Sequence, residues 1–249
     1  FTWANVAAGS YLLTARATDN LGLATTSSPV AITVNVPPVV TLTGPADNAV
    51  FTAPATLTLT AYAADSDGTI ARVEFFNGMT KLGESAAPPY QFAWSNLAAG
   101  TYTVTARATD NAGSVATSAA ITIIANAPPA IAITAPVNNA VVAPATSLAF
   151  TAAATDPDGT IAKVEFFQGT TKLGDAAAIG SGSYVLTLPT GLAYGTYTIT
   201  ARATDNFSAS TASAPLTLRV DSAPQAAAQM VAVTKDTAAT LSLAATDAD

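Results

Sequence analysis

The chain has 249 residues, of which 50% are apolar and only 10% are charged, and its formal net charge at pH 7 is −7. It contains no cysteine and no histidine, which excludes disulfides, thiolate chemistry, zinc sites of the usual kind and catalysis of the Ser-His-Asp type. The acidic balance argues against nucleic acid as a partner, because neutralising phosphates needs Lys and Arg, and no apolar run is long enough to cross a membrane.

The first 36 residues introduce a phrase that returns twice. TARATDN stands at 14–20 and recurs at 105–111 and 200–206, and Pro-Pro at 37–38 recurs at 128–129. Copies of about 90 residues are longer than solenoid repeats and match a self-contained β-sandwich. We therefore predict four parts: the C-terminal half of a module (1–36), two complete modules (37–125 and 128–221) and the start of a further, divergent module (222–249).

The first complete module shows the period of half-buried β-strands. In residues 55–65, Leu57 and Leu59 alternate with Thr58 and Thr60, so that one face is apolar and the other is rich in Thr. Turn residues separate seven such segments, and the module is predicted to be all-β with strands at 39–45, 55–65, 69–78, 79–85, 90–97, 100–110 and 114–125.

A twelve-residue phrase within this module is repeated in the next one. DGTIARVEFFNG at 67–78 returns as DGTIAKVEFFQG at 158–169, and its period predicts a turn followed by a strand with Ile70, Val73 and Phe75 in the core. The second complete module carries four extra residues, which we place around IGSGSY at 179–184.

These phrases resemble bacterial Ig-like domains that occur in tandem in secreted and surface proteins, on the pattern D-x-D-G-x-I-x-x-V-E-F-F. Tyr102, two residues before Val104, resembles the tyrosine corner, although the disulfide and the Trp of antibody domains are absent. The resemblance implies tandem Ig-like seven-stranded antiparallel β-sandwiches in a linear array, located outside the cell or at its surface. The last segment, 222–249, resembles cadherin-like repeats.

Carboxylate and amide side chains gather at two predicted turns of each module, next to linkers that carry Asn35 and Asn126. In an Ig-like sandwich these two turns lie at one end, and their oxygens would suit Ca²⁺, which takes six to eight oxygen ligands. The alternative is turn formation alone, with Asx side chains bonding the backbone and Gly68 and Gly159 supplying positive φ. The candidate metal ligands are Asp65, Asp67, Asp110, Asn111, Asp156, Asp158, Asp205 and Asn206.

A second recurring set is the pair Glu74 and Arg107, repeated as Glu165 and Arg202. On neighbouring strands they predict a cross-strand ion pair on the solvent face, contributing about 0.2–1 kcal/mol; the alternative is a ligand-binding or catalytic Glu. Trp94 and its counterpart Trp3 are interpreted as core residues, the alternative being platforms for sugars. No catalytic residue is predicted, and we expect no enzyme in this segment.

Two functions of different kinds follow from these observations. The first is a non-catalytic segment of an extracellular repeat protein that acts as spacer, stalk or fibre, stiffened by Ca²⁺ at its junctions. The alternative is a set of adhesin or carbohydrate-binding modules of a surface protein or of a secreted polysaccharide-degrading enzyme. The expected partners are the neighbouring modules, with other copies in a fibre or a cell-surface polysaccharide as further candidates, and neither nucleic acid nor a membrane.

Overall fold

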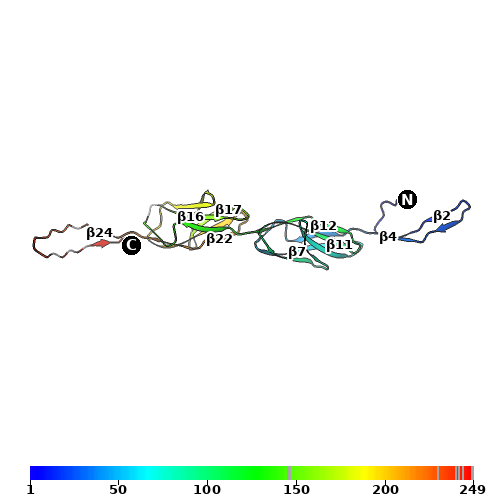
Figure 1. Ribbon diagram of the computed structural model, residues 1–249, viewed down its shortest axis with the longest axis horizontal. Coiled ribbons are helices and arrows are strands. Elements are labelled where there is room, and N and C mark those ends of the chain that lie inside the picture. Colours follow the sequence, from blue (N-terminus) through cyan, green and yellow to red (C-terminus); the bar gives the residue numbers. More distant parts are fainter. Residues whose placement is uncertain (145–146, 229, 239, 241, 243, 248–249) are drawn as a thin grey trace. The chain divides into compact units, whose positions relative to one another are not determined.

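The computed structural model describes residues 1–249 except 145–146, 229, 239, 241, 243 and 248–249 (Figure 1). Every regular element within the described residues is a β-strand, as predicted. The chain divides into two compact units, residues 1–126 and 127–249.

The module within the first unit consists of two sheets that enclose an apolar core (Figure 1). The smaller sheet has the order β10-β7-β5, and the larger one β6-β13-β11-β8-β9, with β12 also paired to β11. Side chains that the period-2 pattern assigns to the inner face are fully buried, among them Leu59, Val73, Phe75 and Val104. The strands are β5 (Val39–Gly44), β6 (Ala49–Thr52), β7 (Ala55–Ala64), β8 (Ile70–Asn77), β9 (Thr80–Ser85), β10 (Tyr90–Leu97), β11 (Gly100–Asp110), β12 (Val115–Thr117) and β13 (Ile121–Asn126).

Two details of this module differ from the predicted seven antiparallel strands. The last predicted strand is broken into β12 and β13, because the hydroxyl of Ser118 accepts the N–H of Ala106 at 3.0 Å in place of a ladder carbonyl. The short strand β6 was not predicted, and it pairs with β13 in parallel. Its sequence gave no signal, since four residues are too few to show a period.

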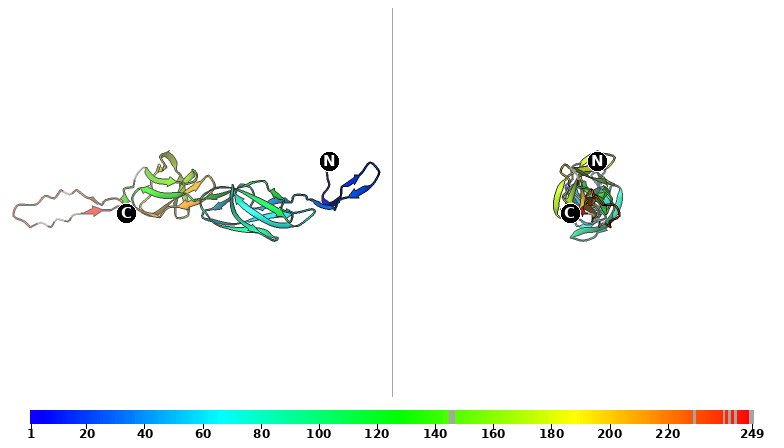
Figure 2. Two further views of the ribbon diagram at one scale, coloured as in Figure 1. Left: turned by 45° about the vertical axis from the view of Figure 1, so that its right-hand side comes forward. Right: turned by 90° about the vertical axis from the view of Figure 1, so that its left-hand side faces the viewer.

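The module within the second unit repeats this arrangement (Figure 2). One sheet has the order β14-β16-β20-β19 and the other β15-β23-β21-β17-β18, with β22 on β21. The four extra residues extend the smaller sheet by β19, which turns into β20 through Ser181 and Gly182, both at positive φ. The strands are β14 (Ala130–Ala135), β15 (Ala140–Val142), β16 (Leu148–Thr155), β17 (Ile161–Gln168), β18 (Thr171–Asp175), β19 (Ala177–Gly180), β20 (Ser183–Leu188), β21 (Gly195–Asp205), β22 (Ser210–Ala212) and β23 (Leu216–Val220).

The two ends of the chain form small hairpins. In residues 1–36, β1 (Gly9–Leu13) pairs with β4 (Val30–Val34), and β2 (Arg16–Thr18) pairs with β3 (Ala24–Thr26). In residues 222–249, β24 (Gln225–Ala226) pairs with β25 (Ala245–Thr246). Part of this last predicted segment, namely 229, 239, 241, 243 and 248–249, lies outside the described residues.

Candidate functional site

The two turns of the first module that carry the predicted aspartates lie next to each other, as predicted from the Ig-like resemblance. Asp65 and Asp67 follow β7, whereas Asp110 ends β11 and Asn111 comes directly after it. The N–H of Thr69 donates to Asn111 Oδ1 at 2.8 Å, and the N–H of Asn111 donates to the carbonyl of Thr69 at 2.9 Å. These two bonds hold the turns together.

Asp110 is the buried centre of this site, with only 2% of its surface exposed. Its Oδ1 accepts the backbone N–H groups of Ala112 and Ser114 at 2.9 and 2.8 Å, and its Oδ2 accepts Asn35 Nδ2 at 2.6 Å. Burial raises the pKa of Asp110, but the hydrogen bonds from Asn35, Ser114 and Ala112 outweigh it and lower that pKa below its usual value. The carboxylate therefore stays ionised while it holds both its own turn and the side chain of Asn35.

Asp67 holds the next residue of the same linker. Its Oδ2 accepts the N–H of Val36 at 3.1 Å, while its own N–H donates to Asp65 Oδ1 at 3.3 Å. Asn35 and Val36 directly precede Pro37, so two turns grip the two residues at which the chain enters the module. We call Asn35, Val36, Asp67 and Asp110 the linker clasp.

The second module builds its turns in the same way. Asp158 Oδ2 accepts the N–H of Ala127 at 3.0 Å, the N–H of Asp158 donates to Asp156 Oδ1, and Asn206 Oδ1 accepts the N–H of Thr160 at 2.8 Å. Asp205 Oδ1 accepts two backbone N–H groups of its own turn, both at 2.8 Å. All eight predicted residues therefore lie at the turns expected of them, four in each module.

The role predicted for Gly68 and Gly159 is wrong. Neither has φ in the left-handed region. A Cβ on Gly68 would lie 2.2 Å from Asn111 Oδ1 and 2.6 Å from Asp65 Oδ2, and one on Gly159 would meet the corresponding atoms of its module at 2.3 and 2.7 Å. Glycine is required here because the side chains of the two turns close over its Cα.

A metal ion has to compete with these hydrogen bonds for the same oxygens. Asp67, Asp110 and Asn111 each accept at least one N–H, whereas Asp65 Oδ2 and Asp156 Oδ2 are buried without a hydrogen-bond partner. Over the described part of the chain, no three His, Cys, Asp or Glu side chains gather so as to hold a metal ion. Calcium at these turns stays a prediction.

Glu74 of β8 forms a second site, together with its partners on β9 and β11. Its Oε1 accepts Lys81 Nζ at 2.6 Å, and its Oε2 accepts Arg107 Nε and Nη2 at 3.1 and 2.8 Å. The pair with Arg107 is cross-strand, as predicted, but the carboxylate does not lie on an open solvent face, because only 5% of its side chain is exposed. The guanidinium of Arg107 also covers the ring of Phe76, 4.7 Å from its centroid.

The bond from Lys81, together with those from Arg107, overcomes the cost of burial and lowers the pKa of Glu74 to about 2. Glu165 is held in the same way by Lys172 and Arg202, and its pKa is also lowered to about 2. A carboxylate with such a pKa exchanges no proton near neutral pH, since general acid–base catalysis needs a pKa close to the working pH. Neither lysine was predicted as a partner, although each stands seven residues after its Glu.

The aromatic residues agree with the predicted core roles in the first module. Trp94 packs against the core and meets Tyr102 edge-on at 5.1 Å. The hydroxyl of Tyr102 donates to the carbonyl of Ala98 at 2.9 Å, which is the hydrogen bond of a tyrosine corner, and Tyr197 makes the same bond to Ala193.

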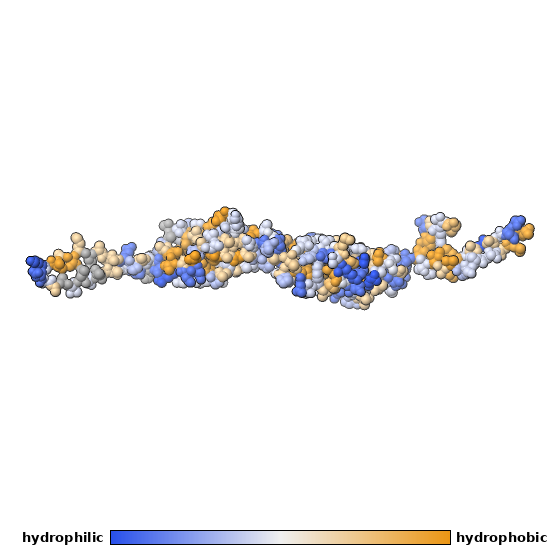
Figure 3. Space-filling view, viewed as in Figure 1, coloured by the Kyte–Doolittle hydropathy of each residue, from blue (hydrophilic) through white to orange (hydrophobic). Residues whose placement is uncertain are grey.

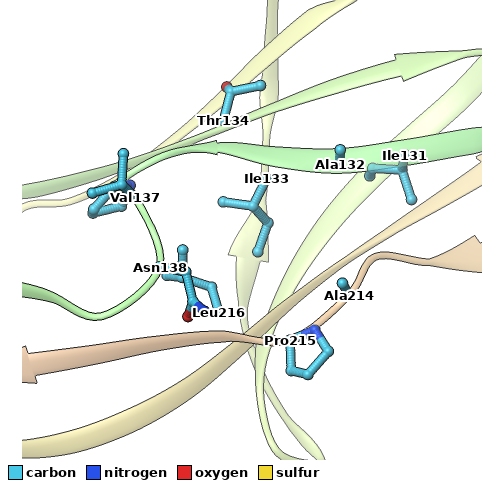
Figure 4. A pocket seen from close by; sticks show the side chains of 10 residues that line it. Ile131, Ala132, Ile133, Thr134, Val137, Asn138, Ala214, Pro215 and Leu216 are labelled. Atoms are coloured by element: carbon cyan, nitrogen blue, oxygen red, sulfur yellow. The ribbon is translucent and has the colours of Figure 1, made fainter.

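A cleft of about 440 Å³ opens beside the edge strand β14 (Figure 4). Ile133 of β14 and Leu216 of β23 line it, together with Val137, Asn138 and Pro215. None of its lining residues is charged. The cleft therefore offers no carboxylate or amine for acid–base chemistry.

A family model described as a bacterial Ig domain matches residues 38–106 and 129–201, which together make up more than half of the chain. The chain belongs to the bacterial Ig domain family. The resemblance inferred from the repeated phrases is thereby confirmed.

Solved structures of tandem Ig and fibronectin(III)-like modules are similar to this bacterial Ig chain. Fibronectin(III)-like modules of Clostridium thermocellum CbhA are 26% identical over 73% of this chain and 93% of theirs, with a TM-score of 0.41. Titin domains I67–I69 are 14% identical over 86% and 74% of the two chains, with a TM-score of 0.49. The N-terminal domains of the Hoc capsid protein of bacteriophage RB49 are 12% identical over 86% and 79%, with a TM-score of 0.48.

A search of curated proteins found no significant relative. The described residues of this bacterial Ig chain include no helix of the length and apolarity needed to cross a bilayer.

Proposed function

We propose that this bacterial Ig chain is a non-catalytic spacer segment of an extracellular repeat protein, and that its modules serve as a stalk or fibre. The linker clasp is the observation that carries the proposal. A spacer transmits direction only if the chain enters each module at a fixed angle, and the clasp bonds both residues that precede Pro37 to the body of the module. Pro37 and Pro38, which follow these two residues, restrict the backbone further.

The strength of the clasp follows from its hydrogen bonds, which include a third one, from Asn35 Nδ2 to Ser114 Oγ at 3.0 Å. The bond from Asn35 to Asp110 reaches a buried carboxylate, and hydrogen bonds to charged groups contribute about 1.5–3 kcal/mol. The bond from Val36 to the exposed Asp67 contributes less, about 0.5–1.5 kcal/mol. The sum is enough to keep the linker bound for most of the time.

Calcium stiffening is a separable part of the proposal. It is supported by two buried oxygens that accept no hydrogen bond, Asp65 Oδ2 and Asp156 Oδ2. A carboxylate oxygen removed from water is stabilised by a nearby cation. Oxygen donors of this kind are those that Ca²⁺ prefers. The spacer role itself rests on the hydrogen bonds alone.

Backbone ¹⁵N relaxation of the full chain in EDTA tests the clasp. We expect the amide of Val36 to have an order parameter near that of rigid backbone, about 0.85, and to fall below about 0.6 in a double variant, Asp67→Ala with Asp110→Asn. In Asp110→Asn the new NH₂ group faces either Asn35 Nδ2 or the backbone N–H groups of the turn. The variant therefore loses either the bond from Asn35 or the bonds from the turn amides.

Asp47→Asn is the matched control, because Asp47 also accepts a backbone N–H, from Thr122 at 2.7 Å, but takes no part in the clasp. It should leave Val36 rigid. An amide of Val36 that is already as mobile as an exposed turn in the unmodified chain would refute the spacer mechanism.

A further inference from the structure

Residues 1–36 expose an apolar face to solvent, which is unfavourable for an isolated hairpin. A cleft of about 500 Å³ runs over it, and Figure 3 shows hydrophobic residues gathered on this segment. Trp3 is 42% exposed, and Leu13 and Ile32 are each 38% exposed. The residues that line the cleft are Phe1, Trp3, Val6, Leu13, Ile32 and Val34.

Each of these six residues stands 91 positions before a core residue of the first complete module. There Leu97 is 3% exposed, Val104 and Ile123 are 0% exposed, and Trp94 packs against the same cluster. The six counterparts are Phe92, Trp94, Leu97, Val104, Ile123 and Ala125. The exposed face is therefore the inner surface of a module, formed by the part that corresponds to residues 92–126.

The local geometry of this surface is already that of a module. The Tyr11 hydroxyl donates to the carbonyl of Ala7 at 2.8 Å, which is the same corner bond as in the complete modules. Trp3 meets Tyr11 edge-on at 4.9 Å, and Tyr11 pairs with Ile32 across β1 and β4, as Tyr102 pairs with Ile123. The face is thus shaped in advance for a complementary half.

Charge identifies what that half has to contain. Arg16 occupies the position of Arg107, whose partner Glu74 comes from the opposing part of its module, on β8. Among the described residues, Arg16 forms no ion pair within 4.0 Å. A complementary half that presents a glutamate at the position of Glu74 would give Arg16 the partner that Arg107 has.

We propose that the apolar face of residues 1–36 binds the first half of an Ig-like module, a polypeptide with the strands and side chains of residues 37–91. In the complete module this half supplies Leu57 and Leu59, which pair with Trp94 and Phe92, and Phe75, which stacks on Phe92 at 6.2 Å. The inference goes beyond the spacer function, because it assigns an interaction surface and the class of its occupant.

The test adds a second copy of residues 37–91 directly before Phe1, because residue 91 precedes Phe92, the counterpart of Phe1. The added copy contains no Trp, so Trp3 reports alone in a Trp94→Phe background. We expect the emission of Trp3 to shift to shorter wavelength, its quenching by acrylamide to fall several-fold, and its urea unfolding to become cooperative.

Two substitutions in the added copy give matched controls. Leu59→Asp places a charge on the buried face and should abolish all three changes, whereas Thr58→Asp lies on the exposed face and should preserve them. Arg16→Met should lower the urea midpoint of Trp3 in the extended chain.

Two results would overturn the proposal. In the first, Trp3 keeps the same emission and quenching in the extended chain as in the unextended one. In the second, sedimentation shows the unextended chain to be a dimer in which Trp3 is already protected, so that a second copy occupies the face.

Discussion

The Glu74→Gln substitution tests the electrostatic design of the module most directly. The carboxylate of Glu74 is buried and accepts hydrogen bonds from Lys81 and Arg107. Gln keeps the shape and one acceptor, but it removes the charge and turns an NH₂ group toward one of the two cations. The module would therefore lose both the ion pairs and a hydrogen bond.

The magnitude follows from the lowered pKa. A fall from 4.5 to about 2 corresponds to about 3 kcal/mol of preference for the ionised form in the folded state. Lys81 and Arg107 are 43% and 41% exposed, so water screens part of this interaction. We expect Glu74→Gln to lower the free energy of unfolding of the module by about 2 kcal/mol.

Urea unfolding followed by the fluorescence of Trp94, in a Trp3→Phe background, measures this loss in the first module alone. With a urea m-value of about 1–2 kcal/mol/M, the midpoint should fall by about 1–2 M. Glu84→Gln is the control: Glu84 also bonds Lys81, at 2.7 Å, but is 51% exposed, and its loss should cost no more than about 0.5 kcal/mol.

The same substitution in the other module, Glu165→Gln, should leave the Trp94 transition unchanged. If Glu74→Gln costs no more than Glu84→Gln, the buried carboxylate contributes nothing beyond a surface pair and the reasoning is refuted.

Three further predictions concern pH, the turns and calcium. The pKa values of Glu74 and Glu165 are lowered in the folded state, so their contribution to stability is complete above about pH 4.5 and is lost as the pH falls toward about 2. The melting temperature should therefore stay constant from pH 7 to about pH 4.5 and then fall. In the Glu74→Gln and Glu165→Gln variants this fall should be smaller. Gly68→Ala should destabilise the first module by about 1–3 kcal/mol, since its Cβ overlaps Asn111 Oδ1 and Asp65 Oδ2, and urea unfolding followed by Trp94 checks this; an unchanged midpoint would show that the two turns open freely. If calcium binds at the turns, the melting temperature should be higher in millimolar Ca²⁺ than in EDTA, because binding adds RT ln(1 + [L]/Kd) to the free energy of unfolding. This rise should be lost when Asp67 and Asp158, which accept the linker amides, are replaced by Ala. Identical melting temperatures in Ca²⁺ and EDTA would mean that these side chains only form hydrogen bonds.

Much of the fold could be read from local pattern. The alternation of apolar with polar residues, together with the turn residues between the segments, predicts β5 and β7 to β11 to within one or two residues, because a strand with one buried face repeats every second residue. The same period places Val73 and Phe75 in the core, where both are fully buried. The four-residue strand β6 and the break at Ser118 are too short to appear in such a pattern.

The residues of the candidate sites were also visible in the sequence, since each recurs in the second module. The sequence defines which residue types stand at each turn and strand: aspartates, Asn111 and Gly68 at the turns, and Glu74 beside the core. Tertiary structure alone decided what each of them contacts. Gly68 is needed because two turns from distant parts of the chain close over it, and Glu74 is buried because Lys81 and Arg107, on two other strands, cover it; such contacts depend on strand register across the sheet, which no local period encodes.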